Sequence, residues 1–340
     1  MKARFTMAVV AIAALLAAPL SFAADKFGIF EKIHASNVSF DETTAALDAA
    51  FASSGLTLHA THDVRLPDDT HRARVYVLTS SAYQDAAGDE SPRTASAQVL
   101  RIAAYTTGDE QATFVNMANP VAHAMVYYSG SSNYDALVAA AEAAADEIRA
   151  LVSAVPGEAV SVQLEPLRTE KHYNKYKGDG PARMMAKFRN FRKSQLELFG
   201  DSAESFDAVV ERVKAAVKGS DVADADDTVG WEQVAVIPLG DDAVYIGLTN
   251  PYIEDRMVRI NSRFRSDGKS DDSPYPGVDH VTALPTDVLV VRQGGETKVL
   301  HYGQMWRMQL YFWDSGYRAF TANMGVPGAI AGSIEDTLGQ

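Results

Sequence analysis

Two stretches of this chain share an ending in which aromatic and branched residues are followed by Asn-Pro. They are FVNMANP at residues 114–120 and YIGLTNP at residues 245–251, and a Gly-Asp pair precedes each of them, as in a turn between strands. An Asn at the N-cap satisfies a free amide of the first helical turn, and a following Pro loses nothing by lacking an N–H. The pattern predicts two hairpins that each lead into a helix, although Asn side chains lining a site are an alternative.

The similarity extends beyond these phrases. Residues 102–125, a hairpin with its Asn-Pro ending, align with residues 234–257. A weaker third copy covers residues 308–334, where we expect strand, turn, strand, a Pro and a short helix. The irregular spacing indicates duplication with divergence, because a solenoid would repeat at a fixed period.

The N-terminus predicts export. Lys2 and Arg4 precede the apolar run from Met7 to Leu20, and small residues follow up to Ala23. This is the pattern of a secretory signal peptide, and the apolar run is shorter than the about 20 residues that a membrane-spanning helix needs. We therefore expect residues 1–23 to be a signal peptide, the mature chain to be soluble, and its location to be periplasmic or secreted.

Composition narrows the possible partners. The chain has no cysteine, so disulfides, thiol nucleophiles and iron–sulfur ligation are excluded. Removal of the signal peptide takes the formal net charge from −13 to −15, which disfavours nucleic acid because phosphate contacts need clustered cations. No later segment is long and apolar enough to suggest a membrane span.

Periodicity predicts the remaining elements. Apolar residues at helical spacing indicate four helices, which we place at residues 40–51, 134–155, about 181–199 and 206–219. Alternating or β-branched runs indicate further strands at residues 56–64 and 73–79. At about 150 residues per domain, the chain after residue 23 is long enough for two domains, which we place at residues 24–165 and 166–340.

The opening helix and strand, FDETTAALDAAFASSGLTLHATHDV, and the hairpin VLRIAAYTTGDEQATFVNMANP resemble the bacterial family called domain of unknown function 302. The resemblance covers about 90 residues of the first half and, less closely, the second half from Phe206. It implies an α+β fold of two related small α/β domains, each a largely antiparallel sheet backed by helices. The family has no assigned activity or catalytic residues. Long additions around residues 158–200 and 259–285 depart from it.

The stretch LHYGQMWRMQLYFW is the strongest candidate for a binding site. Interpreted as a strand, it places large side chains on both faces, where a core strand would normally have only one such face. The ordinary interpretation is a core strand with a covered outer face. The functional alternative is a pocket for a planar or apolar ligand, or a His/Met site for a soft metal or haem. The candidate ligand-binding residues are His301, Met305, Arg307, Met308, Tyr311 and Trp313.

A basic stretch stands out from the acidic chain. Cations surround an apolar stripe on the helix predicted after Pro181, and such a helix can dock on anionic lipid or an acidic partner. The ordinary interpretation is a solvated basic face over a core-packed stripe, or pairing with acidic residues of the same chain. The candidate anion-binding or partner-binding residues are Arg183, Lys187, Arg189, Arg192 and Lys193.

Other clusters predict little chemistry. His59 and His62 point to opposite faces of a regular strand unless a bulge intervenes, and nearby His71 does not change this. The acidic segment SDVADADD lacks the ligand register of an EF-hand, so we interpret it as a solvated linker and assign no metal ligands. The chain contains no nucleophile elbow, zinc-protease motif, phosphate loop or dinucleotide fingerprint.

These observations favour non-catalytic binding of a small ligand, a cofactor or an envelope protein, in the cleft between the repeats or around residues 301–313. One alternative is an enzyme without a recognisable motif, hydrolase-like or other, with His301 and acidic neighbours as acid–base candidates. Another is an envelope interaction protein that acts through the basic helix. Exposed strand edges also allow a homodimer. The sequence identifies no cofactor.

Overall fold

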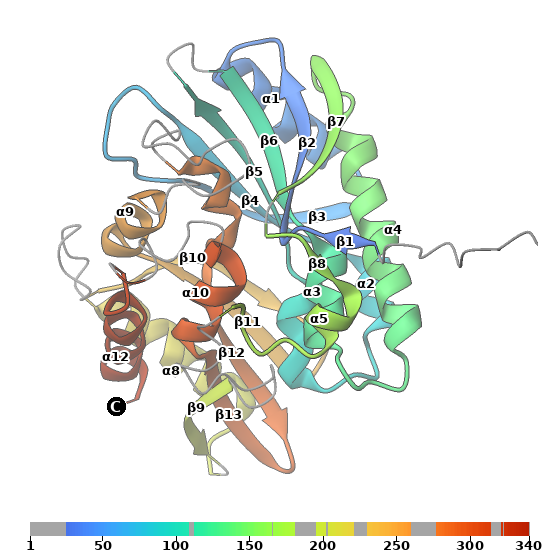
Figure 1. Cartoon of the computed structure of the whole chain (residues 1–340). Coiled ribbons are helices and arrows are strands. Elements are labelled where there is room, and N and C mark those ends of the chain that lie inside the picture. Colours follow the sequence, from blue (N-terminus) through green and yellow to red (C-terminus); the bar gives the residue numbers. More distant parts are fainter. Residues whose placement is uncertain are drawn as a thin grey trace, which may run out of the picture.

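The computed structural model describes residues 25–108, 112–164, 166–180, 195–201, 203–220, 230–259, 277–313, 321 and 323–339. They form a six-stranded and a five-stranded antiparallel sheet, both backed by helices, and a two-stranded ribbon (Figure 1). The predicted α+β class is confirmed. The predicted signal peptide, the five candidate cations of the basic stretch and most of the acidic segment lie outside the described residues. The described part of the chain contains no helix long and apolar enough to cross a membrane.

The first sheet has the strand order β3-β4-β5-β6-β2-β7, and every neighbouring pair is antiparallel. Its strands are β2 (Phe30–Ser36), β3 (Leu56–Asp63), β4 (Ala73–Ser80), β5 (Leu100–Thr107), β6 (Ala112–Ala118) and β7 (Gly157–Leu164). Strands β4 and β5 are buried along almost their whole length, whereas β7 lies at an edge and is mostly exposed. The core of this half therefore lies beneath its central strands.

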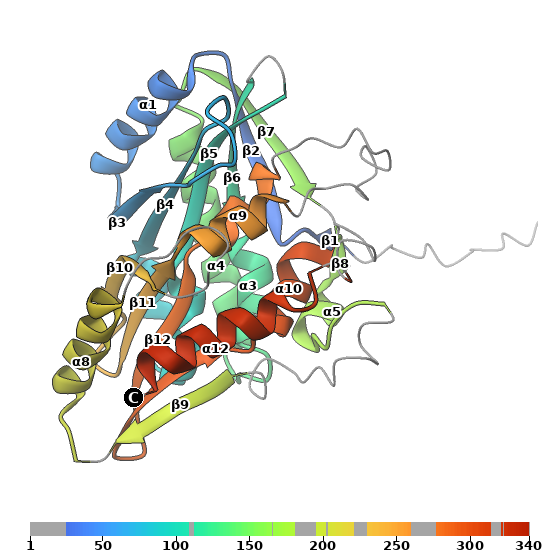
Figure 2. The ribbon, with the colours of Figure 1, turned by 90° about the vertical axis from the view of Figure 1, so that its left-hand side faces the viewer.

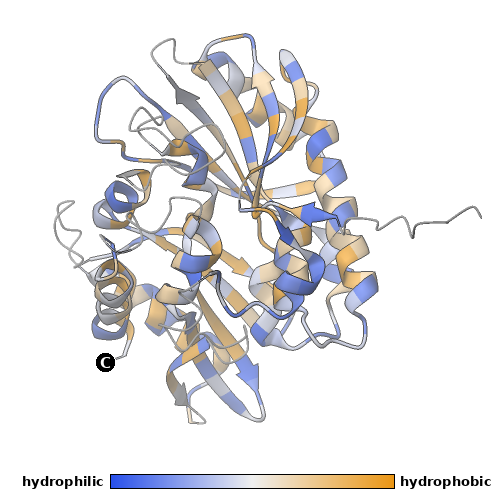
Figure 3. Ribbon diagram, in the orientation of Figure 1, coloured by the Kyte–Doolittle hydropathy of each residue, from blue (hydrophilic) through white to orange (hydrophobic). Residues whose placement is uncertain are grey.

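The helices of the first half are α1 (Phe40–Ala52), α2 (Ser81–Ala86), the 3₁₀ helix η1 (Pro92–Gln98), α3 (Pro120–Tyr127) and α4 (Tyr134–Val152). Of these, α1, α3 and α4 begin where the sequence predicts, whereas α2 and η1 were not predicted. Ser39 and Glu42 form a capping box at the start of α1. Polar and apolar residues alternate around α4 (Figure 3), whose buried face includes Leu137, Ala141 and Ile148. This helix packs on α1, α2 and α3 and covers the sheet, as its apolar periodicity predicts.

The second sheet has the order β10-β11-β12-β13-β9 and is also antiparallel. Its strands are β9 (Gln195–Asp201), β10 (Glu232–Pro238), β11 (Ala243–Thr249), β12 (Thr286–Gln293) and β13 (Glu296–Tyr302). The helices of this half are α8 (Phe206–Gly219), α9 (Pro251–Arg259), the 3₁₀ helix η2 (Val278–Ala283), α10 (Gln304–Phe312) and α12 (Val326–Leu338). Figure 2 shows α12 between α8 and α10, and it contacts both.

The two sheets follow the same plan. If β9 to β13 take the places of β2 to β6 in chain order, the strand order of the second sheet equals that of the first without β7. Two bulges fall at corresponding places. At the first bulge, His59 of β3 has no partner residue in β4, and Val234 of β10 has none in β11. At the second bulge, Ile33 of β2 has no partner residue in β6, and Leu198 of β9 has none in β13. Under this correspondence α10 occupies the place of α3, and α9 that of α2.

This correspondence corrects the internal alignment made from the sequence. The alignment paired the hairpin β5–β6 with β10–β11, whereas β10–β11 takes the place of β3–β4. Asn119 and Asn250 both cap helices, as predicted, but they follow strands at different positions of their sheets. The two hairpins carry similar residues although β5 is buried and β10 is partly exposed, so sequence similarity alone selected the wrong pair.

In two segments the secondary structure differs from the prediction, a strand in place of a helix and a helix in place of a strand. Residues 195–199, placed in the helix predicted after Pro181, belong to strand β9. Residues 304–312, interpreted as a strand and as part of a third hairpin, form helix α10. Seven of the nine residues of α10 are buried, so the helix is enclosed on nearly all sides. A helix buried all round has no polar face, which is why its period is hard to distinguish from that of a core strand. The final helix with Pro327 in its first turn is present as α12.

The halves contact each other in a reciprocal way. Helix η1 of the first half packs on β11 and β12, and helix η2 of the second half packs on β4, β5 and β6. Strands β3 and β10 also lie against each other. Residues 168–174 also lie against the first half. Strand β8 (Arg168–Thr169) pairs with β1 (Lys26–Phe27), and helix α5 (Glu170–Asn174) packs on α3.

Candidate functional site

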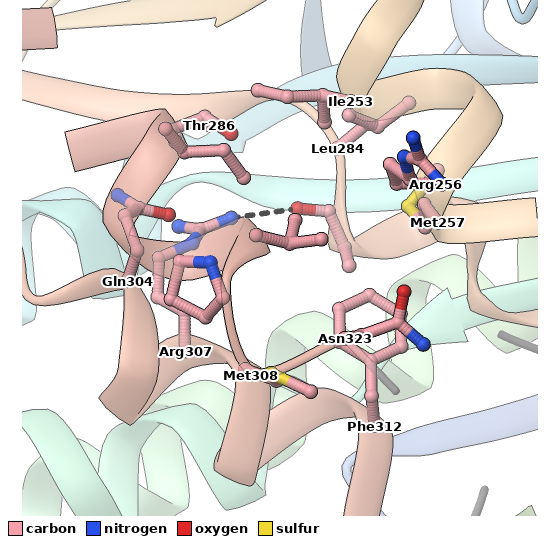
Figure 4. A pocket seen from close by; sticks show the side chains of 14 residues that line it. Ile253, Arg256, Met257, Leu284, Thr286, Gln304, Arg307, Met308, Phe312 and Asn323 are labelled. Carbon is pink, nitrogen blue, oxygen red and sulfur yellow. Dashed lines mark hydrogen bonds between the residues drawn. The ribbon is translucent and has the colours of Figure 1, made fainter. Parts of the chain in front are cut away.

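A pocket lies in the second half between α9, α10, α12 and the segment from η2 to β12 (Figure 4). Its volume is about 60 Å³, enough for about four or five water-sized positions. Most of the lining is apolar, and the lining side chains are those of Ile253, Arg256, Met257, Ala283, Leu284, Thr286, Gln304, Arg307, Met308, Phe312, Asn323, Val326, Pro327 and Ile330. Apolar walls with a few polar groups are typical of small-molecule sites.

Helix α10 forms one wall because of its spacing. Gln304, Arg307, Met308 and Phe312 recur at intervals of three, one and four residues, so they lie on one side of the helix. Helix α9 contributes Ile253, Arg256 and Met257 by the same periodicity. The wall that had been interpreted as one face of a strand is therefore a helical face.

Arg307 enters the pocket with its charge already paired. Its guanidinium forms an ion pair with Asp287 and donates a hydrogen bond of 2.9 Å to the carbonyl oxygen of Ala283, drawn in Figure 4. Ser96 of η1 donates to the other carboxylate oxygen of Asp287 at 2.7 Å. All three side chains are buried. This pair is therefore held from both halves of the molecule and has little capacity to change partner.

Arg256 has a different environment. It lies at the edge of the pocket beside Met257 (Figure 4), and its guanidinium carbon is 5.2 Å from the centre of the Tyr252 ring. Its Nε is buried and has no hydrogen-bond partner. Within the described part of the chain, the guanidinium forms no ion pair and no hydrogen bond. The pocket thus holds one paired and one unpaired guanidinium.

Behind Arg307 lies a buried polar cluster that joins the halves. The Nη2 of Arg101 on β5 is 2.9 Å from Nε2 of His123 and 2.9 Å from the hydroxyl of Tyr311. Arg101 also donates from Nη1 to the carbonyl of Ala283, the acceptor that Arg307 uses. The Nδ1 of His123 is 2.7 Å from the carbonyl of Asn119, so that nitrogen carries the hydrogen and Nε2 is the acceptor.

Burial and a neighbouring cation keep His123 neutral. Desolvation is the main cause, with Arg101 as the second, and together they lower the pKa of His123 to about 3. Burial likewise lowers the pKa of His301 to about 4, against the opposing effect of Asp287. Neither ring nitrogen of His301 has a hydrogen-bond partner. His301 therefore lacks the hydrogen-bonded carboxylate that would orient an acid–base histidine.

The six residues predicted as a ligand site are only partly brought together. Arg307 and Met308 line the pocket. Met305 and Trp313 pack against Met308, and Tyr311 belongs to the buried cluster at the junction of the halves. His301 is buried in β13. Arg256, Ile253 and Met257 were missed, although PYIEDRM carries a helical apolar spacing that could have indicated them.

The three early histidines do not converge. His59 contacts the hydroxyl of Thr79 at 2.9 Å, His71 contacts Asp68 at 3.0 Å, and His62 reaches across to Glu254 of α9 at 2.6 Å. No group of three or more potential metal ligands lies together among the described residues. The sequence had suggested an ordinary polar edge, and it gave no sign that His62 contacts the second half.

The corresponding place in the first half is filled. Under the sheet correspondence, Tyr83 of α2 takes the position of Ile253, and Tyr128 after α3 that of Phe312. Both tyrosines are almost completely buried, and their ring centres are 6.5 Å apart in an edge-to-face arrangement. The corresponding side chains of the second half, Ile253 and Phe312, are smaller and line the pocket.

Comparisons with known proteins add little. No protein-family model and no curated protein matches this chain. One match among solved structures is the crystal structure of an uncharacterized conserved protein DUF302 from Bacillus stearothermophilus. It has a TM-score of 0.31 and 14% sequence identity, and it covers 37% of this chain and 98% of that chain. A likeness of this size carries no argument about function.

Proposed function

We propose that this protein is a binding protein whose second half holds a small, mostly apolar ligand in the pocket between α9, α10 and α12. One observation carries the proposal: the two sheets share a plan, yet Tyr83 and Tyr128 fill in the first half the place that stays open in the second. Burial of apolar surface stabilises such a complex by about 25 cal/mol per Å². A ligand of a few non-hydrogen atoms fits the volume.

The pocket is also suited to binding because its walls are held in place. Arg307, which forms part of the wall, is fixed by Asp287 and by the carbonyl of Ala283. A preformed site loses less conformational entropy when the ligand enters. Nothing in the geometry of the pocket requires a reaction, so we prefer binding to catalysis.

The ancestry and location of the protein belong to the same proposal. The matching strand order and bulge positions support duplication of one small α/β unit of the domain of unknown function 302 type. The signal-like N-terminus supports export to the periplasm or the medium. The enzyme alternative and the alternative of an envelope interaction protein using the basic helix remain predictions.

Methyl NMR tests the pocket directly, because Met257 and Met308 line it. With methyl-labelled methionine and the neutral probe 1-hexanol, we expect shifts at Met257 and Met308 and none at Met117 or Met125 of the first half. The double variant Ile253→Tyr with Phe312→Tyr copies the filled half and should abolish the shifts. The variant Leu196→Tyr, at an exposed position of β9, serves as a control that should keep them. Absence of shifts in the unmodified protein, or equal shifts in the double variant, would refute the proposal.

A further inference from the structure

We propose that the ligand is a small monocarboxylate whose carboxylate pairs with Arg256 while its hydrocarbon part fills the pocket. This inference rests on the proposed function and adds the chemical class of the ligand. It begins from the contrast between the two guanidiniums at the pocket, since Arg307 is paired with Asp287 and Arg256 is not.

The charge at the pocket is unbalanced. Arg307 and Asp287 cancel each other, and none of the described residues that line the pocket is acidic. The other buried carboxylate nearby, that of Glu254, is engaged with His62 and Arg65 of the first half. Among the described residues, one positive charge therefore remains at the pocket, that of Arg256, and it attracts an anion.

The hydrogen-bonding capacity points in the same direction. A buried donor without an acceptor costs about 1–3 kcal/mol, so the Nε of Arg256 gains from any ligand that supplies an oxygen. A guanidinium offers parallel N–H groups whose spacing fits both oxygens of a carboxylate. Cation–π contact with Tyr252 involves the face of the guanidinium and uses none of these N–H groups.

The pocket walls limit the chemistry and length of the rest of the ligand. Ile253, Met257, Leu284, Met308 and Phe312 offer no hydrogen-bonding group, so the body of the ligand is hydrocarbon. Room for about four or five water-sized positions corresponds to a chain of about four to six carbons. Hexanoate meets both conditions.

The test compares hexanoate with 1-hexanol at pH 7, where the carboxylate is ionised. Titrations of the full mature chain follow the methyl signals of Met257 and Met308. We expect hexanoate to bind at least about tenfold more tightly than 1-hexanol to the unmodified protein. The variant Arg256→Gln should bind hexanoate about 10-fold to 100-fold more weakly and 1-hexanol unchanged, because a charged hydrogen-bonded pair is lost. The variant Arg292→Gln, an exposed cation on β12, should behave as the unmodified protein.

The two proposals fail in different ways. Equal affinity for hexanoate and 1-hexanol in the unmodified protein, or hexanoate binding that Arg256→Gln leaves unaltered, would overturn the carboxylate inference while leaving the pocket as a binding site. Failure of both probes to shift Met257 and Met308 would overturn the pocket itself. Thermal unfolding of Arg256→Gln alongside Arg292→Gln establishes that each variant is folded at the temperature of the titration.

Discussion

Glu254 of α9 and His62 of β3 form a hydrogen-bonded pair of 2.6 Å that joins the two halves of the molecule. The carboxylate of Glu254 is completely buried. It also accepts hydrogen bonds from the backbone N–H of Arg65 at 2.7 Å and from the hydroxyl of Thr249 at 2.8 Å. Because α9 also carries Ile253, Arg256 and Met257, this pair fixes the helix that forms one wall of the pocket.

Replacement of Glu254 by Gln should destabilise the protein strongly. The amide would place N–H groups against donors and would remove one of the two carboxylates that pair with Arg65, and breaking a buried pair costs about 3–5 kcal/mol. Urea unfolding should show this loss. The control Glu211→Gln removes an exposed carboxylate that pairs with Lys214 and should change the stability by less than about 0.5 kcal/mol. Equal stability of the two variants would show that the pair does not hold the halves together.

The same carboxylate should affect how the free energy of unfolding changes at low pH. Burial alone would raise the pKa of Glu254, but hydrogen bonds and the charge of His62 outweigh it, so the pKa lies below its ordinary value near 4.5. A depressed folded-state pKa stabilises the protein above the unfolded value, and this stability is lost as the pH falls through the folded value. The variant Glu254→Gln should therefore lose less stability than the unmodified protein below about pH 4.5.

Two buried histidines should make the protein acid-sensitive at a higher pH. The pKa values of His123 and His301 lie near 3 and 4 in the folded state, against about 6.5 when unfolded. Between these limits the unfolded chain binds more protons, so stability decreases as the pH falls below about 6.5. Each histidine contributes up to about 1.4 kcal/mol per pH unit.

The variant His301→Leu isolates one of these contributions. Both ring nitrogens of His301 lack partners, so its replacement by an apolar residue should cost little at pH 7. Urea unfolding at pH 7, 6, 5 and 4 should show a shallower loss of stability than in the unmodified protein. An unaltered pH dependence would contradict the assignment of His301 as a neutral buried group.

The two capping asparagines should contribute more to stability than their caps alone. Asn119 accepts from the N–H of Val121 at 3.0 Å and donates to the carbonyl of Gly28 and to Gln163. Asn250 accepts from the N–H of Ile253 and donates to the carbonyl of Gly230. Loss of a cap costs about 1 kcal/mol, and each buried group left unpaired adds about 1–3 kcal/mol. We expect both Asn119→Ala and Asn250→Ala to cost more than the loss of a cap alone in urea unfolding.

Serine substitutions separate the cap from the other bonds. Ser at position 119 can still accept from the first turn of α3, but its short side chain does not reach Gly28 or Gln163. Asn119→Ser should therefore recover about 1 kcal/mol of the loss in Asn119→Ala. If Ser recovered the full stability, the bonds to Gly28 and Gln163 would contribute nothing.

Local patterns were sufficient for elements with a strong period. Helix α1 with its capping box, helices α4 and α8, and the two Asn-Pro helix starts follow from the spacing of apolar residues and from cap chemistry. Both signals are local, because one face or one terminus of an element determines them. The α+β class followed from the same elements together with the family resemblance.

The two segments whose secondary structure was predicted wrongly have no clear hydrophobic periodicity. The segment 304–312 is surrounded by packed elements, so large side chains on all sides fitted a strand and a helix equally well. Residues 195–199 continue an apolar stripe from the basic stretch but complete the edge of the second sheet as β9. In both cases tertiary packing outweighed local preference.

The sequence by itself determined the strongly periodic helices, the strands β3 to β6, β10 and β11, two Asn caps and the absence of cysteine chemistry, because these depend on neighbouring residues or on composition. Only the tertiary structure decided which hairpins correspond, that His62 pairs with Glu254, and that Arg256 lies beside an apolar pocket with no partner among the described residues. These relationships join residues far apart in the chain. Their energies depend on burial and on the charges brought near one another, which a local pattern does not record.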